Sequence, residues 1–295
     1  MRVLIVGLPL FAERLKNDLT EFDSTNKYYF LDTYYNKWDR IKVLFMIPRM
    51  DVVYSINGTL GDSRVFNLAL KLKKKLMITW VGTDVIKAKN LKEVNQLFLN
   101  KAEHYCEVDW IQNELLELNI HAKVLNFFNF KEPKKSSFTM NNKLQVLSYI
   151  SKGREEYYGW NEVLKAAKKL PDVHFTIVGT DIEKNLPENL KCLGWVEDME
   201  AQFENCHCTI RFLEHDGLSG FVLESLFRGK HVIYSEDLDH CLHAKTADEI
   251  IEQLTYLNSQ LNQKTLKINS EGIDFVKSNF NSDFILSQLI EEFKR

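Results

Sequence analysis

Residues 208–227 read CTIRFLEHDGLSGFVLESLF, and this stretch decides the fold class. It begins with a short β-rich run, Cys208–Phe212, and ends in a helical pattern, Ser219–Phe227. Gly217 and Gly220 lie between the two and remove side chains from the start of the helix. A strand that turns directly into a helix is the repeating unit of parallel α/β sheets. The stretch therefore predicts one βα unit of such a sheet.

The same alternation extends over the rest of the carboxyl-terminal half. More strands are expected there at Leu144–Ile150, His174–Val178, Leu190–Leu193 and His231–Tyr234. Helices are expected at Trp160–Lys169, Met199–Glu204 and Ala247–Asn258, with two more in residues 271–295. The strand runs are short and apolar, as the buried strands of a parallel sheet are.

The amino-terminal half repeats this pattern. Strands are expected at Val3–Gly7, Tyr28–Leu31, Val52–Ile56, Leu76–Trp80, Tyr105–Val108 and Lys123–Leu125. Helices are expected at Phe11–Thr20, Arg64–Lys73, Leu91–Asn100 and Ile111–Leu118. Residues 131–143 are polar and have no periodicity, which predicts a linker. We therefore expect two Rossmann-like, doubly wound α/β domains facing a cleft, over residues 1–135 and 144–280, with a helix at 281–295 packing back on the first.

Length and composition agree with two globular domains. The chain has 295 residues, of which 45% are hydrophobic and 27% are charged. No apolar run approaches the roughly 20 residues that span a bilayer, and the first apolar run is too short for a signal peptide. Five scattered cysteines do not make a disulfide framework. These features predict a cytoplasmic protein.

Positive charge is concentrated in the first half of the chain. Residues 1–140 contain 21 Lys and Arg against 16 Asp and Glu, and the rest contains 17 against 25, so the two parts carry +5 and −8. A basic half indicates an acidic partner, and we expect weak peripheral contact with the inner face of a membrane rather than with nucleic acid. The densest cluster is Lys71, Lys73, Lys74 and Lys75. Its simpler interpretation is a solvated helix end, which the helix dipole favours.

The turn after Cys208–Phe212 has the features of an anion site. Backbone N–H groups and the helix dipole at a helix N-terminus suit phosphate, and the residues that would supply them are Gly217, Leu218, Ser219 and Gly220. The Ser219 hydroxyl either caps the helix or bonds a phosphate oxygen. Asp216 and Glu224 carry carboxylates that accept hydrogen bonds from vicinal hydroxyls. An ordinary strand–loop–helix connection is the alternative, because Gly-x-x-Gly alone is a weak signal.

Other strand ends in this half supply cations, glycines and a flat ring. Lys152, Gly153 and Arg154 follow the strand at Leu144–Ile150, and Arg154 can bind a diphosphate through two hydrogen bonds. The next strand ends at Gly179. The one after is followed by Trp195 and Val196, where backbone groups can contact a base. These strand ends predict a phosphate-bearing ligand with a base.

At this point the sequence resembles a known family. In chain order it has Gly153-Arg154, Tyr158-Gly159 before a helix, Pro171-Asp172-Val173-x-Phe175-x-Ile177-Val178-Gly179, Leu193-Gly194-Trp195-Val196 and Asp216-x7-Glu224. This order is similar to the carboxyl-terminal half of retaining glycosyltransferases of the GT-B fold, specifically family 4. The resemblance spans the whole chain in layout but is specific only over residues 144–235.

The resemblance implies roles for particular residues. The acid at Asp216 and the amides that follow it would contact the transferred sugar, and Glu224 would hold the ribose. Arg154 matches the first cation that binds the diphosphate. The family has Lys-Gly at the second cation, where this chain has Tyr158-Gly159, so that cation is missing or is supplied by Lys152 or Arg211.

The amino-terminal half resembles the family less closely. Ile78-Thr79-Trp80-Val81-Gly82-Thr83-Asp84 is similar to its Trp/His-x-Gly-Ser/Thr-Asp segment, which implies that Trp80, Gly82, Thr83 and Asp84 lie on the acceptor side, together with Gly7. Asp84 is either a helix cap or a carboxylate in the cleft. The family's glycine-rich loop is reduced here to Gly7-Leu8-Pro9, and proline has no N–H to offer.

Three other features have simpler interpretations beside the functional ones. Cys206-His207-Cys208 has the residue types of a metal site, but no second cluster supports it, so we expect core packing and no metal. His215 either contacts the donor as part of the catalytic group, with Asp216 and Arg154, or is exposed to solvent. The aromatic residues between Tyr28 and Trp38 are interpreted as strand and loop packing, with a carbohydrate platform as the alternative.

The sequence thus favours a glycosyltransferase that moves a sugar from a UDP- or GDP-linked donor to a hydroxyl acceptor, which would be a glycan, a lipid-linked molecule or a small molecule. The resemblance implies retention of configuration and no need for a metal or another cofactor. Two alternatives stay open. One is a non-catalytic, glycosyltransferase-like binding subunit, and the other is a sugar-nucleotide epimerase of the GT-B fold.

Overall fold

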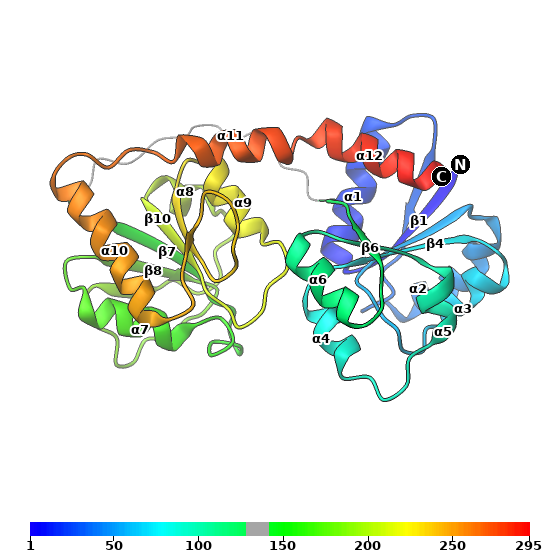
Figure 1. The fold of residues 1–295 in the computed structure, drawn as a ribbon, viewed down its shortest axis with the longest axis horizontal. Coiled ribbons are helices and arrows are strands. Elements are labelled where there is room, and N and C mark those ends of the chain that lie inside the picture. Colours follow the sequence, from blue (N-terminus) through cyan, green and yellow to red (C-terminus); the bar gives the residue numbers. More distant parts are fainter. Residues whose placement is uncertain (128–141) are drawn as a thin grey trace. The chain divides into compact units, whose positions relative to one another are not determined.

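A computed structural model describes residues 1–127 and 142–295 of the chain (Figure 1). These form two compact units. The N-terminal unit comprises Met1–Asn129 and Phe280–Arg295, and the C-terminal unit comprises Phe130–Asn279. The linker predicted over residues 131–143 lies, except for its last two residues, outside the described part of the chain.

The N-terminal unit is built on one parallel sheet with the strand order β2-β1-β3-β4-β5-β6. Its strands are β1 Arg2–Gly7, β2 Lys27–Phe30, β3 Val52–Ile56, β4 Lys75–Trp80, β5 Glu103–Cys106 and β6 Ala122–Val124. Its helices are α1 Pro9–Phe22, α2 Lys37–Met46, the 3-10 turn η1 Ile47–Arg49, α3 Arg64–Lys71, α4 Thr83–Lys89, α5 Gln96–Lys101, α6 Asp109–Glu117 and α12 Ser282–Lys294.

Helix α12, from the far end of the sequence, completes the core of the N-terminal unit. Its Leu286, Leu289, Ile290 and Phe293 join a buried cluster with side chains of α1 and of strands β1 to β5. Glu292 fixes the helix, because its carboxylate accepts hydrogen bonds from Tyr105 Oη at 2.8 Å and Lys123 Nζ at 3.3 Å. Figure 1 shows α12 beside α1, in red and blue.

The C-terminal unit contains a second parallel sheet, ordered β12-β11-β10-β7-β8-β9. Its strands are β7 Gln145–Tyr149, β8 His174–Val178, β9 Leu190–Cys192, β10 Cys208–Arg211, β11 His231–Tyr234 and β12 Leu242–His243. Its helices are α7 Trp160–Lys169, α8 Glu200–Glu204, α9 Gly220–Phe227, α10 Ala247–Asn262 and α11 Ser270–Asn279. The order reverses between β7 and β10, which makes the loops after these two strands neighbours.

Side chains that alternate along β7 bury themselves on opposite faces of this sheet. Val146 belongs to a cluster with α7 and α10, whereas Leu147 belongs to a smaller cluster with Phe203 of α8 and Phe221 of α9. Both faces are therefore covered, as doubly wound sheets require. Two six-stranded parallel sheets with flanking helices confirm the predicted α/β, Rossmann-like fold class. None of the described helices is both long and apolar enough to cross a lipid bilayer.

The main difference from the predicted elements is helix α2. The aromatic residues up to Trp38 were expected to pack as strand and loop, and Tyr28 is indeed buried in β2. Trp38, however, lies in a helix that begins where the Asn36 side chain accepts hydrogen bonds from the N–H groups of Trp38 and Asp39. Its apolar residues lie on both its inner and outer sides, so no single-face helical period marks it in the sequence. The short elements α4 and β12 were also not predicted.

Candidate functional site

The candidate site lies in the C-terminal unit, on the loops that follow β7 and β10. These loops touch at Gly159, where an added Cβ would lie 2.6 Å from Phe212 Cδ1 and 2.9 Å from the Phe212 carbonyl oxygen. Gly159 also has a φ of +69°, which favours glycine. In open α/β sheets, ligands bind outside the carboxyl ends of the strands at the point where the strand order reverses.

Two arginines and an aromatic pair form a stack on these loops. The guanidinium of Arg154 lies 4.4 Å from the ring centroid of Tyr157 and 5.5 Å from that of Tyr158. The guanidinium of Arg211 lies 5.0 Å from the same Tyr158 ring. Tyr158, at the position where the resemblance implies a lysine, thus contacts two cations through its π face. Arg154 is exposed to solvent.

Arg211 is bound to Asp216 across the β10–α9 loop. Its Nε and Nη2 donate hydrogen bonds of 2.7 Å and 3.1 Å to the two carboxylate oxygens, and both side chains are nearly buried. Burial acts against the arginine charge, but Asp216 outweighs it and raises the pKa of Arg211. Tyr234 Oη donates a hydrogen bond of 2.8 Å to the carbonyl oxygen of Gly217 and lies 3.3 Å from Asp216. The ion pair therefore fixes the loop that leads into α9.

The N-terminus of α9 combines unbonded backbone donors, among the described residues, with open space on the Cβ side of Gly220. Within the described part of the chain, the N–H groups of Ser219, Gly220 and Phe221 donate no hydrogen bond. Ser219 is the N-cap residue, but its buried side chain makes no capping bond. A Cβ added at Gly220 would meet nothing within 4 Å. Together with the helix dipole, these donors form a site of the kind that binds anions.

Glu224 lies one turn further along α9. Its side chain is 35% exposed, and its carboxylate lies 3.8 Å from Arg228 Nη1. Arg228 also donates a 2.7 Å hydrogen bond to Glu200 of α8. The preceding residues of the turn, Gly217 and Leu218, are buried.

The remaining strand ends of the unit differ in what they offer. Lys152 Nζ lies 2.7 Å from an Asp181 carboxylate oxygen, so this exposed cation has a partner of its own. Gly153 has a φ of +79° and open space on its Cβ side. Gly179 is packed so closely that a Cβ would lie 2.6 Å from the Ile150 carbonyl oxygen. Trp195 is 77% exposed, and Val196 beside it is half-buried.

Three more residues lie near the site. Glu155 and Tyr234 carried no functional signal in the sequence, whereas Tyr157 follows Arg154 closely enough to shape a pocket over it. Tyr157 Oη donates a 2.6 Å hydrogen bond to the carbonyl oxygen of His215, which places the half-buried His215 beside the β7 loop. Glu155 accepts hydrogen bonds from Gly153 N and Thr180 Oγ1, both at 3.0 Å, and so joins the β7 and β8 loops. Tyr234 holds the Gly217 turn. These contacts join loops that follow strands distant in sequence, so the sequence pattern does not predict them.

The predicted acceptor-side residues belong to the N-terminal unit. Trp80 is fully buried, and its Nε1 donates a 3.2 Å hydrogen bond to His104 Nδ1. Gly7 and Gly82 are also buried, whereas Thr83 is exposed. These residues end strands β1 and β4 and begin α4.

Asp84 joins two loops of this unit. Its carboxylate accepts N–H groups from Gly58 at 2.5 Å and from Val81 and Val85 at 3.1 Å. Burial raises the pKa of Asp84 to about 6, although these hydrogen bonds act in the opposite direction. The structure thus shows a buried carboxylate in the first turn of α4 that bonds the segments before the helix, while the N-cap residue is Gly82, which has no side chain to make a capping bond.

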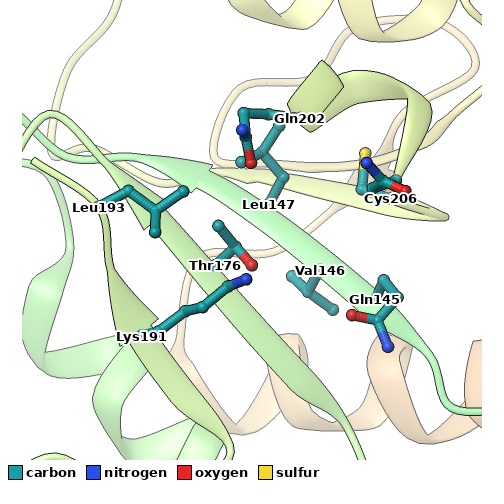
Figure 2. A pocket seen from close by; sticks show the side chains of 9 residues that line it. Gln145, Val146, Leu147, Thr176, Lys191, Leu193, Gln202 and Cys206 are labelled. Atoms are coloured by element: carbon teal, nitrogen blue, oxygen red, sulfur yellow. The ribbon is translucent and has the colours of Figure 1, made fainter. Parts of the chain in front are cut away.

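Cys206, His207 and Cys208 are all buried, and His207 Nδ1 accepts the Gln145 N–H at 3.0 Å, which matches the core-packing interpretation. Cys206 also lines a hollow of about 360 Å³ on the sheet face beside α8 (Figure 2). Gln145, Thr176 and Lys191 line the same hollow. It lies over the first residues of β7, whereas the candidate residues follow the last ones.

No protein-family model matches the sequence, and no curated protein matches it. Solved structures do share the fold. Anabaena Alr3699/HepE in complex with UDP-glucose aligns with a TM-score of 0.74 at 12% identity, over 100% of this chain and 99% of that chain. A glycosyltransferase from Rickettsia africae ESF-5 aligns with a TM-score of 0.70 at 14% identity, over 99% and 98%.

A UDP-GlcNAc 2-epimerase from Neisseria meningitidis, bound to UDP-GlcNAc, aligns with a TM-score of 0.56 at 15% identity, over 99% of this chain and 100% of that chain. At such identities the likeness establishes the fold. The predicted GT-B fold is thereby confirmed.

Proposed function

We propose that the protein is a glycosyltransferase that moves a sugar from a nucleotide-sugar to a hydroxyl acceptor. The observation that carries the proposal is the α9 N-terminus. There, N–H groups without a partner among the described residues and the open side of Gly220 lie one loop away from the exposed cation of Arg154. Fixed donors and a positive charge stabilise the negative charge that develops on a departing diphosphate. Two of the similar structures were solved with UDP-linked sugars, which supports testing UDP-sugars first.

The other residues have roles that follow from this arrangement. Glu224 would accept hydrogen bonds from the ribose hydroxyls, and the exposed ring of Trp195 would lie beside the base. Asp216 would orient the transferred sugar from its ion pair with Arg211, which therefore acts as a positioning residue. Retention of configuration, independence of metal ions, the acceptor and a cytoplasmic location stay predictions from the sequence.

A thermal-shift screen of UDP-, GDP-, ADP- and CMP-sugars tests the proposal, because a ligand that binds only the folded state raises its midpoint. We expect one nucleotide class to raise the midpoint and to lose at least about tenfold in affinity in Glu224→Gln, which removes a charged hydrogen-bond acceptor. Glu252→Gln, an exposed substitution on α10, serves as the matched control. Binding of no nucleotide-sugar, or equal binding by Glu224→Gln, would overturn the site assignment.

Epimerisation is the second candidate, and the structural likeness to the Neisseria meningitidis epimerase favours it. An epimerase changes the sugar of its nucleotide-sugar without an acceptor. Product analysis of each bound nucleotide-sugar in the absence of acceptor separates the two reactions. Binding without transfer, hydrolysis or epimerisation would instead indicate a non-catalytic binding subunit.

A further inference from the structure

Helix α2 of the N-terminal unit exposes a row of large apolar side chains. Trp38 is 79% exposed, Ile41 is 52% exposed and Phe45 is 69% exposed. Their spacing places them on one side of the helix. At about 100° per residue, Ile41 and Phe45 each lie about 160° around the helix from the buried Val43. The apolar row therefore points away from the core, and Tyr35, 80% exposed, lies just before it.

The helix that carries this row is firmly built. Asn36 caps its first turn, and the fully buried Ile47 follows its last turn. Arg40 donates hydrogen bonds to the carbonyl oxygens of Thr33 and Tyr34, which holds the preceding turn. The exposure of the apolar row is thus a fixed property of the helix, and packing within the unit gives no reason for it.

Basic side chains lie on both sides of the apolar row. Around the helix, Lys37 lies about 40° beyond Ile41, and Lys42 lies about 60° beyond Phe45 on the other side. Both lysines are exposed, and neither has an ion pair among the described residues. Arg49 donates a 3.2 Å hydrogen bond to the Phe45 carbonyl oxygen, which keeps a third cation at this end.

The acidic groups of this segment are engaged with backbone. Asp39 accepts the Asp32 N–H at 3.1 Å, and Asp32 accepts the N–H groups of Tyr34 and Tyr35, both at 2.9 Å. The exposed surface of α2 is therefore aromatic and apolar along its centre and basic along its margins.

We propose that this surface, defined by Tyr35, Trp38, Ile41, Phe45, Lys37, Lys42 and Arg49, docks on an anionic lipid bilayer. Aromatic rings settle at the boundary between headgroups and acyl chains, and marginal lysines reach the anionic headgroups. A helix of this kind lies in the plane of the membrane surface. The charge complementarity selects the lipid over a second copy of this chain. A symmetric pairing of two α2 surfaces would bring like cations together.

The sequence predicted a membrane contact from the positive charge of the first half of the chain. The proposal assigns this contact to α2 rather than to the lysine cluster. The lysine cluster considered there lies at the end of α3, and Lys75 is bonded to Glu103 and to the Glu292 carbonyl oxygen. The proposal does not depend on the proposed donor site, because every residue of the surface belongs to the N-terminal unit.

Co-sedimentation with phosphatidylcholine vesicles, with and without phosphatidylglycerol, tests the proposal. We expect binding only to the anionic vesicles, and a loss of more than about tenfold in Trp38→Ser/Phe45→Ser, because each ring loses its apolar burial. The matched control is Tyr256→Ser/Phe284→Ser, which replaces two aromatic side chains that are 55% exposed elsewhere. The control variant should bind like the unaltered chain, and both variants should keep their thermal midpoints.

A second set of variants measures how much the lysine charges contribute to vesicle binding. Lys37→Gln and Lys42→Gln should each weaken binding about fivefold at low salt. Lys169→Gln, an exposed lysine of α7, should have no effect. Quenching of tryptophan fluorescence by lipids labelled in the acyl chain should disappear in Trp38→Phe, which still binds.

Three results would overturn the proposal. The first is equal binding to neutral and anionic vesicles, or none at all, and the second is unchanged binding by Trp38→Ser/Phe45→Ser. The third is a dimer in lipid-free solution that Trp38→Ser/Phe45→Ser dissociates, which would assign the surface to self-association. Nucleotide-sugar binding measured on the same samples shows separately whether the donor site is intact.

Discussion

Both sheets reverse their strand order once, between β1 and β3 in the N-terminal unit and between β7 and β10 in the C-terminal unit. In the N-terminal unit the loops there bond to each other. Leu8 N donates to the Ile56 carbonyl oxygen at 2.9 Å, Pro9 has no N–H, and Gly58 N donates to Asp84. In the C-terminal unit the N–H groups of Ser219, Gly220 and Phe221 have no such partners among the described residues, and the exposed Arg154 lies on the neighbouring loop.

The two reversal points therefore share a topology but not a chemistry. The N-terminal one places Leu8 N and Gly58 N in internal hydrogen bonds and has a proline at the position after Leu8, so these donors are not available to a ligand. The C-terminal one retains donors and a cation that an anion can satisfy. Similar strand arrangements thus do not imply similar binding, and we expect the loop residues to decide which reversal point can bind a charged ligand.

Gly7→Ala is expected to have the largest effect. An added Cβ would lie 2.1 Å from the Ile56 carbonyl oxygen, at a φ of +109°. Overpacking and backbone strain should lower the free energy of unfolding by about 4 kcal/mol. Chemical denaturation, with hydrogen exchange of the N-terminal sheet, measures the loss.

The matched control for Gly7→Ala is Gly194→Ala, where φ is +67° but the nearest atom, Asp181 Cβ, lies 3.6 Å away. Left-handed backbone alone should cost about 1 kcal/mol there. Equal losses of unfolding free energy in the two variants would show that the close contact with Ile56 does not cause the destabilisation by Gly7→Ala.

Asp84 should give the N-terminal unit a pH dependence. Its folded pKa of about 6 lies above the ordinary 3.8, so the folded state holds an extra proton between these values. Stability from this group is present at pH 4 and is lost as the pH rises through 6, by up to about 3 kcal/mol. Thermal midpoints from pH 4 to 8 should converge or cross for the unaltered chain and Asp84→Asn. The exposed control Asp62→Asn should instead run parallel to the unaltered chain, and parallel curves for Asp84→Asn would refute the prediction.

Arg154→Gln should weaken nucleotide-sugar binding by about 10- to 100-fold, or roughly 2 kcal/mol, because a charge-assisted contact to the diphosphate is lost. Among the described residues, the exposed side chain of Arg154 interacts with the Tyr157 and Tyr158 rings, so stability should fall by less than about 1 kcal/mol. Titration calorimetry measures the affinity, with Lys169→Gln as the control. Undiminished affinity would remove Arg154 from the site.

Gly220→Ala should have the smallest and most specific effect. The new methyl group would project into open space at the start of α9, so stability should rise by up to about 1 kcal/mol. The same methyl group would occupy the space in front of the free amides, and nucleotide-sugar affinity should fall about fivefold. Gly61→Ala, whose Cβ would make ordinary contacts in the N-terminal unit, should leave affinity unchanged. A Gly220→Ala variant that binds normally would mean that the ligand does not approach these amides.

Local patterns in the sequence predicted most of the fold. The strands His174–Val178 and His231–Tyr234 and the helix Trp160–Lys169 agree with the structure at both ends, because each is a short apolar or one-faced segment between turn residues. Helix α2 could not be predicted in this way, since Trp38 and Phe45 point outward while Val43 points inward.

The sequence predicted individual residues of the candidate site but not the contacts between them. Arg154 and the turn before Glu224 could be singled out as strand-end cations and a helix start. The bond between Arg211 and Asp216, and the contacts of the Tyr158 ring with two guanidinium groups, could not be predicted. Such contacts depend on which strand ends lie side by side, and that is set by the register of the whole sheet.

The position of α12 has a consequence for how the protein is made. The core of the N-terminal unit includes Phe293, whose ring lies 5.5 Å from that of Tyr54. The ribosome adds this residue only after the entire C-terminal unit, which takes about 10 to 30 s at typical rates of synthesis. During that interval the sheet face that α1 and α12 share is covered only by α1, and the part that packs against α12 stays exposed. We therefore expect the nascent N-terminal unit to engage chaperones until its last helix arrives.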